Sequence, residues 1–332
     1  MDGLFMVVVL IVIFALIFDF INGFHDTANA IATSVSTKAL TPRRAIILAS
    51  TMNFVGAMTF TGVAQTITSG IADPFDMANG TTVILAALIA AIAWNLITWY
   101  FGIPSSSSHA IIGGITGAVI ASAGFGAIKY KGFLSIMEGL LFSPFLAFVV
   151  GFIVYSIIKV IFKNSNLAKT NKRFRMVQVI TAAGQSYAHG TNDAQKSMGI
   201  ITMALIVGGM HDTTDVPFWV QFSCALAMAL GTSVGGWRII KTVGGKIMKI
   251  RPVNGVAADL TGAAVIFGAT VLHMPVSTTH VISSAILGVG SSHRVKGVNW
   301  GVAKRMVVTW LITLPISAAI GGGCYYILNV FL

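Results

Sequence analysis

Two short polar motifs inside apolar sequence hold side chains that suit ion binding. NGFHDTANA at residues 22–30 and HGTNDAQKS at residues 189–197 each contain a central carboxylate. Polar residues in both motifs are spaced three and four apart, which puts them on one face of a helix. Carboxylate and amide oxygens suit a small hard cation or a proton. The predicted coupling-ion residues are Asn22, Asp26, Asn29, Asn192 and Asp193, with Asp26 and Asp193 as the metal ligands if the ion is Na⁺.

A second pair of motifs is rich in hydroxyl groups. Pro104 is followed by four serines and His109, and Pro275 is followed by VSTT and His280. Proline is favoured in the first helical turn and hydroxyls are favoured at the N-cap, so each motif predicts the start of a helix. Unpaired N–H groups and the positive end of the helix dipole make such a start suitable for an oxyanion. The predicted anion-binding residues are Ser105, Ser106, Ser107, Ser108, Ser277, Thr278, Thr279, Thr27 and Thr191.

Other polar residues support these motifs. Lys196 is the one basic residue within the polar sequence, and we expect it to pair with Asp193 or Asp26, or to contact an anion. His109, His280 and Gln195 complete the supporting set, although the histidines have the alternative of bonding a neighbouring backbone group. Three further carboxyl groups without a counterpart in the other motif are candidate proton or cation groups: Asp19, Glu138 and Asp259.

Ordinary helix packing is the alternative for both pairs of motifs. Buried polar groups in membrane proteins bond one another between helices, and serine and threonine bond the preceding helical turn. Recurrence of both motifs favours ion binding, because intramembrane ionisable residues are usually functional.

The composition is that of a membrane protein. Of the 332 residues, 55% are hydrophobic and 9% are charged, against roughly 25% charged in a soluble domain. At about 20 residues for each crossing, the chain holds roughly 10–12 membrane segments. The expected fold is therefore an all-α polytopic membrane protein. Its apolar segments are residues 4–36, 45–69, 80–101, 105–126, 144–163, 176–209, 218–236, 255–273, 276–290 and 306–331.

Positive charge lies between the apolar segments. The net charge is +11, and every Lys or Arg except Lys196 falls in or beside a connection. Such residues orient membrane proteins by facing the cytoplasm, so we expect no nucleic-acid partner. Both cysteines lie in apolar stretches, which argues against a disulfide framework or a cysteine metal site.

The two halves of the chain are related. Both motif pairs recur at an offset of about 170 residues, which indicates an internal duplication. The predicted organisation is a first membrane repeat at 1–163, a basic cytoplasmic linker at 164–175, and a second, inverted membrane repeat at 176–332. Gly23 and Gly190 are predicted helix breaks, so the repeats are expected to contain discontinuous or re-entrant helices.

Loop charges test the inversion. Arg43 and Arg44 follow the first polar motif, whereas Asp212 and Asp215 follow the second. The loop at 70–79 carries Asp73 and Asp76, whereas its counterpart at 238–251 carries five basic residues. Both comparisons predict opposite orientations for the halves. Lys129 and Lys131 fall on the outer side in this arrangement, against the rule, unless the segments around them are re-entrant.

These motifs resemble the inorganic phosphate transporter family, whose members carry two GxNDxANA-like signatures in inverted halves. His25 stands where many members have Asn, and Asn53 stands where many animal members have Glu. The compact length is similar to that of bacterial members. The resemblance implies symport of phosphate with H⁺ or Na⁺, a homodimer, and anion binding near the two Ser/Thr helix starts. Some relatives in this family carry sulfate.

We therefore predict a secondary active transporter for inorganic phosphate, multi-pass in the bacterial cytoplasmic membrane. Its partners are phosphate and the lipid bilayer, and we expect no enzymatic activity and no cofactor beyond the co-transported H⁺ or Na⁺. Nearby carboxylates favour phosphate over sulfate, because phosphate retains a proton to donate. The alternatives are a sulfate/H⁺ symporter and a passive anion channel. An intramembrane serine hydrolase is disfavoured, because the duplicated serine runs lack one distinguished nucleophile.

Overall fold

The computed structural model describes residues 2–73, 75 and 79–331, and these residues form twelve α-helices and no strand. Asp76, which contributed to the loop comparison, lies outside the described residues. In the first half the helices are α1 (Asp2–Ser36), α2 (Pro42–Ala57), α3 (Gly62–Gly70), α4 (Gly80–Phe101), α5 (Ser107–Ala123) and α6 (Tyr130–Ile161). In the second half they are α7 (Leu167–Val207), α8 (Phe218–Val234), α9 (Trp237–Lys241), α10 (Pro252–Val271), α11 (Thr278–Arg294) and α12 (Trp300–Leu328). Two short 3₁₀ helices are η1 (Phe125–Ala127) and η3 (Val295–Gly297), and η2 (Thr242–Lys246) is a short π-helix.

The order of elements repeats, which confirms the predicted fold class. A long helix with a polar motif, a bent pair, a helix, a hydroxyl-capped helix and a long closing helix occur in each half. The chain bends by 68° between α2 and α3 and by 60° between α8 and the segment of α9 and η2. Five helices are long and apolar enough to cross a membrane alone, or up to seven crossings if each bent pair counts as one.

Several predicted boundaries shift. Helix α6 begins at Tyr130 instead of residue 144, and α12 begins at Trp300 instead of residue 306. Both helices continue through an internal proline, Pro144 or Pro315, which membrane helices tolerate because neighbouring groups satisfy the freed carbonyl. Helix α7 already begins at Leu167, so the connection between the halves is shorter than residues 164–175.

The predicted helix breaks at Gly23 and Gly190 are wrong, because α1 and α7 run unbroken through them. Both glycines instead allow two backbones to touch. A Cβ on Gly190 would meet the carbonyl oxygen of Asn53 on α2, and one on Gly23 would meet that of Met228 on α8. Small residues of this kind let membrane helices approach closely. The halves therefore interlock through α1 against α8 and α2 against α7.

We expect Gly190→Ala to destabilise the protein by about 1–3 kcal/mol, the usual cost of overpacking. The added methyl group has backbone on its far side, and backbone cannot rotate away. Gly184→Ala on the same helix is the matched control, because a Cβ there meets nothing within 4 Å. Thermal unfolding in detergent measures both variants. Equal melting temperatures for Gly190→Ala and the parent protein would contradict this packing argument.

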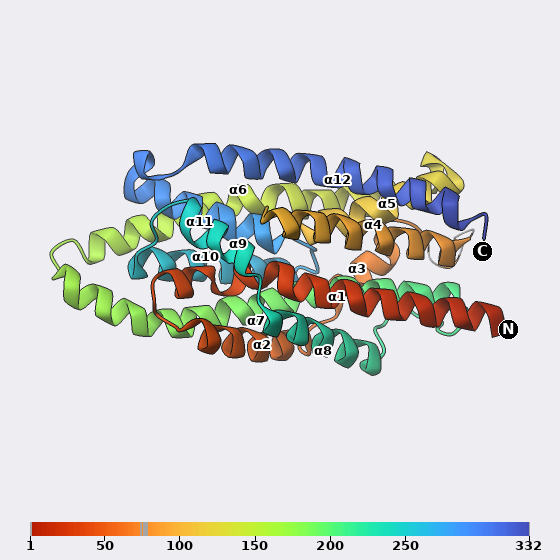
Figure 1. Ribbon diagram of the computed structural model, residues 1–332, viewed down its shortest axis with the longest axis horizontal. Coiled ribbons are helices and arrows are strands. Elements are labelled where there is room, and N and C mark those ends of the chain that lie inside the picture. The colour runs from red at the N-terminus through yellow and green to blue at the C-terminus, as the bar shows by residue number, and fades with distance from the viewer. Residues whose placement is uncertain (1, 74, 76–78, 332) are drawn as a thin grey trace.

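The two halves are interleaved and lie in opposite directions. Helix α5 packs on α12 and α6 packs on α11, so each half covers part of the other. Figure 1 shows α1 running away from the end that holds both termini and α7 running toward it. This antiparallel arrangement is the predicted inversion of the repeats.

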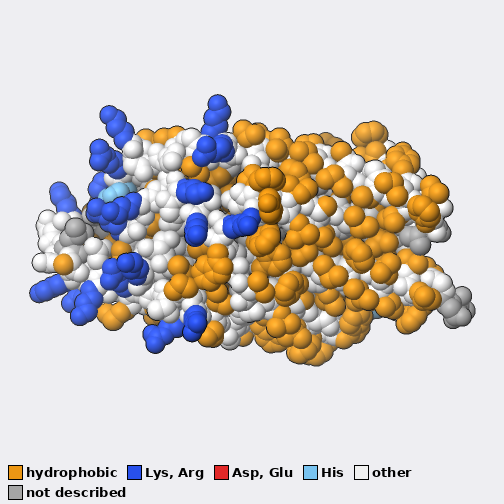
Figure 2. All heavy atoms as spheres, viewed as in Figure 1, with side chains coloured by type: hydrophobic (Ala, Val, Ile, Leu, Met, Phe, Trp, Pro, Cys, Tyr) orange, Lys and Arg blue, Asp and Glu red, His pale blue; other side chains and the backbone are white. Residues whose placement is uncertain are grey.

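Charge marks one end of the molecule. Lys and Arg side chains gather at the end opposite the termini, whereas hydrophobic side chains cover the rest of this face (Figures 1 and 2). The positive-inside rule predicts that this basic end faces the cytoplasm. Lys129 is an exception that has a local partner: its Nζ lies 2.9 Å from Oδ2 of Asp73. This hydrogen bond from Lys129 lowers the pKa of the Asp73 carboxyl.

Candidate functional site

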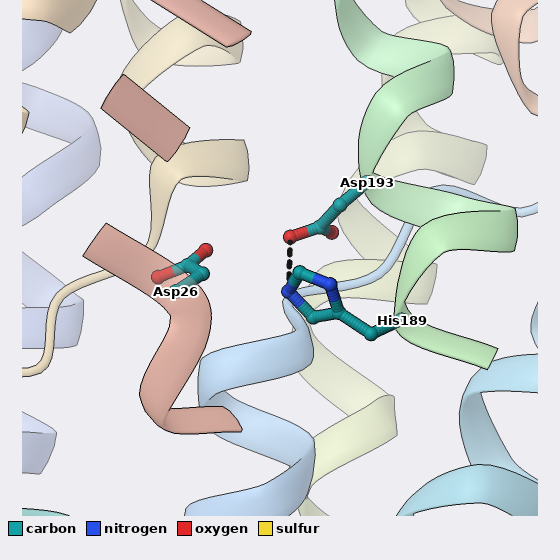
Figure 3. Close-up of side chains that lie close together, drawn as sticks. All are labelled: Asp26, His189 and Asp193. Carbon is teal, nitrogen blue, oxygen red and sulfur yellow. Dashed lines mark ion pairs between the residues drawn. The ribbon is translucent and has the colours of Figure 1, made fainter. Parts of the chain in front are cut away.

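The two polar motifs meet where α1 packs against α7. Asp26 projects from α1, and His189 and Asp193 project from α7 toward it (Figure 3). One ligand atom from each of these three residues lies within 4.8 Å of the other two. All three side chains are buried. A carboxylate pair and an imidazole are therefore brought together from opposite halves in the interior of the protein.

Both predicted helix starts occur, although the prolines lie before the first turn. Helix α5 begins at Ser107 with Ser106 as its N-cap, and Ser106 Oγ accepts a hydrogen bond from the His109 backbone N–H at 3.1 Å. Helix α11 begins at Thr278 with Ser277 as its N-cap, which accepts from the His280 backbone N–H at 3.3 Å. The remaining first-turn N–H groups have no acceptor within their own helix. Each start thus leaves donors free for a ligand.

Hydroxyls of these helix starts reach the motif carboxylates. Ser107 donates to Asp26 Oδ2 at 3.0 Å, and Thr279 donates to Asp26 Oδ1 at 3.2 Å. Thr278 donates to Asp193 Oδ2 at 3.0 Å. Asp26 therefore receives hydroxyls from both halves. The structure thereby joins three of the predicted anion-binding residues to the two motif carboxylates in one cluster.

The two helix starts also touch each other. The rings of His109 and His280 lie 4.6 Å apart between centroids, and His280 stacks on Trp310 at 4.1 Å. Ser108 donates to the carbonyl oxygen of Val276, in the turn before α11, at 2.9 Å. These contacts place the histidines as packing partners at the junction of the two helix starts.

Asp193 has a fixed positive charge beside it, whereas Asp26 does not. The ammonium of Lys196 pairs with Asp193 Oδ1, and both side chains are fully buried. His189 Nε2 lies 3.1 Å from Asp193 Oδ2. Asn29 occupies the position of Lys196 in the first motif, and its amide donates to Thr279 Oγ1 at 2.9 Å. The duplicated motifs are therefore electrostatically unequal.

Two histidines missed as site residues belong to this cluster. His25 Nδ1 lies 2.7 Å from Asp26 Oδ1, and its Nε2 lies 3.2 Å from Thr98 Oγ1. His189 Nδ1 lies 3.1 Å from Asn53 Oδ1. Their positions within the polar motifs were the available signal.

Several predicted ligands have other partners. Thr27 and Thr191 donate to backbone oxygens of Gly23 and Ala188, at 2.6 and 2.7 Å. Gln195 Oε1 accepts the backbone N–H of Ala64 at 3.0 Å, in the first turn of α3. These three side chains therefore bond backbone groups, as the helix-packing alternative describes.

Asn192 and Ser105 make hydrogen bonds next to the carboxylate cluster. Asn192 Oδ1 accepts the Val276 backbone N–H at 3.2 Å, and its amide donates to the Met274 carbonyl at 3.2 Å. Asn192 thereby holds the turn that leads into α11. Ser105 donates to Thr98 Oγ1 at 2.7 Å, next to His25.

The three carboxyl groups without a repeat counterpart differ in environment. Asp259 is buried on α10 and accepts hydroxyl hydrogen bonds from Thr33 at 2.6 Å and Thr181 at 3.2 Å. Asp19 is buried on α1, seven residues before Asp26. Glu138 is exposed on α6 and therefore lies outside the polar interior.

Two hollows lie beside the turns that precede the hydroxyl-capped helices. One of about 540 Å³ is lined by Gly102, Ile103 and Pro104 together with the basic residues Lys246, Lys304 and Arg305. The other, about 600 Å³, includes Thr66, Lys129 and Lys131. Thr66 donates to the carbonyl oxygen of His273, in the turn between α10 and α11. Each hollow is thus basic and adjoins the turn of one half.

Comparisons with known proteins agree with this architecture. The phosphate transporter family matches residues 22–169 and again 162–321. A probable low-affinity inorganic phosphate transporter of Bacillus subtilis (strain 168) is 75% identical over 99% of both chains. One from Rhizobium meliloti (strain 1021) is 46% identical over 94% of this chain and 93% of that protein. A solved structure described as the sodium-dependent phosphate transporter has a TM-score of 0.87 at 26% identity, covering 98% of this chain and all of that one.

Proposed function

Because the chain belongs to the phosphate transporter family, we propose that it carries inorganic phosphate across the bacterial cytoplasmic membrane by symport with H⁺ or Na⁺. The observation that carries the proposal is the meeting of two helix starts with Asp26 and Asp193. Anion donors and cation acceptors thereby share one buried space between inverted halves. Substrate sites at such a repeat interface are typical of secondary transporters.

The anion binds between the starts of α5 and α11. First-turn N–H groups and the positive dipole ends favour a tetrahedral oxyanion there. The hydroxyls of Ser107, Thr278 and Thr279 turn from the carboxylates to the anion when it enters, because a hydroxyl rotates freely and donates to either. Lys196 adds a positive charge within the same polar interior.

Asp26 gives the site a preference for phosphate over sulfate. Monohydrogen phosphate retains one proton, and a carboxylate without a fixed counter-ion accepts a hydrogen bond from it. Sulfate has no such proton, so its oxygens would face the carboxylate with like charge. The pairing of Lys196 with Asp193 leaves Asp26 as the acceptor for this bond.

A coupling cation offsets the negative charge that phosphate brings. Asp26, His189 and Asp193 supply acceptor atoms for H⁺ or Na⁺ within 4.8 Å of one another. The basic hollows beside Pro104 and beside His273 serve as entrances from the two membrane faces. Exchange of conformation between the interlocked halves then opens one entrance at a time.

Uptake of labelled phosphate into proteoliposomes tests the function. We expect accumulation above the external concentration under an imposed H⁺ or Na⁺ gradient, and weak competition by sulfate. Equilibration without accumulation under either gradient would instead identify a passive channel. Strong sulfate competition with negligible phosphate uptake would identify a sulfate transporter.

Thr278→Val should raise the apparent KM for phosphate about tenfold to a hundredfold, since a hydrogen bond to a charged group contributes about 1.5–3 kcal/mol. Valine keeps the branched shape of threonine but removes the hydroxyl that reaches Asp193. Thr278→Ser, which keeps the hydroxyl, should stay close to the parent KM. Initial rates of labelled phosphate uptake measure both variants. Equal KM values for the Val and Ser variants would remove Thr278 from the anion site.

A further inference from the structure

Asp19 lies on the same face of α1 as the central site. Asp19, Asn22 and Asp26 are spaced three and four residues apart, which aligns them along the helix. Seven residues correspond to about 10 Å along the axis. Asp19 lies on the side of Asp26 toward the N-terminus, and therefore toward the end opposite the basic surface. It stands between the outer end of the molecule and the proposed phosphate site.

Asp19 differs from the other buried carboxylates of the described chain in its lack of partners. It is 0% exposed, and neither of its oxygens makes a hydrogen bond with any described residue. Asp26, Asp193 and Asp259 each accept at least one hydroxyl hydrogen bond.

Two polar side chains near Asp19 also make no full hydrogen bond among the described residues. Both polar atoms of Asn22 are buried and make no hydrogen bond within the described residues. The hydroxyl of Ser197 on α7 lies close enough to interact with Asp19, but the geometry is not that of a full hydrogen bond. Asp19 therefore lies among buried polar groups of α1 and α7 that make no full hydrogen bonds with one another.

The charges around Asp19 favour a proton over a metal ion. Among the described residues, the titratable and charged groups that face it are Asp193 and Lys196 on α7 and Cys224 on α8. The Lys196 ammonium is held by Asp193 and is not a direct partner of Asp19. An ionised carboxylate buried without a partner is unfavourable, and a metal cation would be repelled by the nearby ammonium. A protonated carboxyl is neutral and avoids both costs.

We propose that Asp19, and not the central cluster of Asp26, His189 and Asp193, carries the coupling proton when the coupling ion is H⁺, an assignment that rests on the proposed symport of phosphate. One H⁺ from the outer solution adds to a carboxylate oxygen of Asp19 and forms an O–H bond. The halves then change conformation with phosphate at the central site. Hydration of Asp19 in the inward-facing arrangement breaks that O–H bond and releases the H⁺ to the cytoplasmic side.

Asp19→Asn tests this assignment, because asparagine imitates the neutral carboxyl but cannot release a proton. In proteoliposomes with equal phosphate on both sides, the variant should exchange labelled for unlabelled phosphate as the parent does. Under an imposed pH gradient it should accumulate no more phosphate than without the gradient. Asp19→Glu should recover part of the accumulation. Glu138→Gln, at an exposed carboxyl of α6, should leave both measurements unchanged.

Three results would overturn the assignment. The first is uphill accumulation by Asp19→Asn under the pH gradient. The second is loss of folding or of phosphate exchange in Asp19→Asn. A neutral side chain at position 19 would then not match the resting state of Asp19. The third is accumulation by the parent protein under a Na⁺ gradient alone. Failure of the proposed function is distinct, because the parent protein would then exchange no phosphate.

Discussion

Replacing Asp26 by asparagine should abolish coupled phosphate uptake while the protein stays folded. Asparagine keeps the size of the side chain but loses the charge that accepts hydroxyls from Ser107 and Thr279. Its amide also presents a donor where phosphate is expected to donate its own proton. Loss of a hydrogen bond to a charged group costs about 1.5–3 kcal/mol, so we expect uptake to fall at least about tenfold. Labelled phosphate uptake under an ion gradient is the measurement.

The folded state should survive Asp26→Asn, because no fixed cation loses its partner. His25, whose Nδ1 lies 2.7 Å from Asp26 Oδ1, also keeps its second contact, with Thr98 Oγ1 at 3.2 Å. The matched control is Asp212→Asn, the same chemical change in an exposed loop, which should leave uptake intact. Unchanged coupled uptake in Asp26→Asn would remove this residue from the site.

Asp193→Asn should have a different consequence, a large loss of stability. Lys196 is fully buried, and its ammonium pairs with Asp193. Breaking a buried ion pair by removing one partner costs about 3–5 kcal/mol, because the remaining charge is uncompensated. The double variant Asp193→Asn with Lys196→Met should recover much of this stability without recovering transport. Thermal unfolding in detergent, together with phosphate uptake, separates the two effects.

Removing the other partner of this ion pair, by Lys196→Met, should cost less stability than Asp193→Asn. Lys196→Met leaves Asp193 with two polar neighbours, because His189 Nε2 lies 3.1 Å from its Oδ2 and the Thr278 hydroxyl donates to the same oxygen at 3.0 Å. We therefore expect the melting temperature to fall less in Lys196→Met than in Asp193→Asn. Equal losses in the two variants, or no loss in Asp193→Asn, would show that this ion pair does not stabilise the fold.

The sequence by itself determined the membrane class, the duplicated inverted halves and both helix starts. These features depend on local or one-dimensional signals: long apolar runs, charges that alternate between loops, and hydroxyls at a fixed offset after Pro104 and Pro275. Ser106 and Ser277 are N-caps because a hydroxyl just before a helix bonds its own first turn. No distant part of the chain is needed for that bond.

The tertiary structure decided which of these groups meet. The sequence alone is compatible with a helix break or with close helix packing at Gly23 and Gly190. In the structure Gly23 packs against the backbone of α8 and Gly190 against that of α2, so both glycines serve close packing. Lys196 had two candidate carboxylates, and it pairs with the one on its own helix. The lack of hydrogen-bond partners for Asp19 cannot be predicted from the sequence either. It depends on the side chains that all the surrounding helices place around this carboxyl group. Residue spacing specifies a helix face, whereas the crossing of α1 and α7 specifies what that face touches.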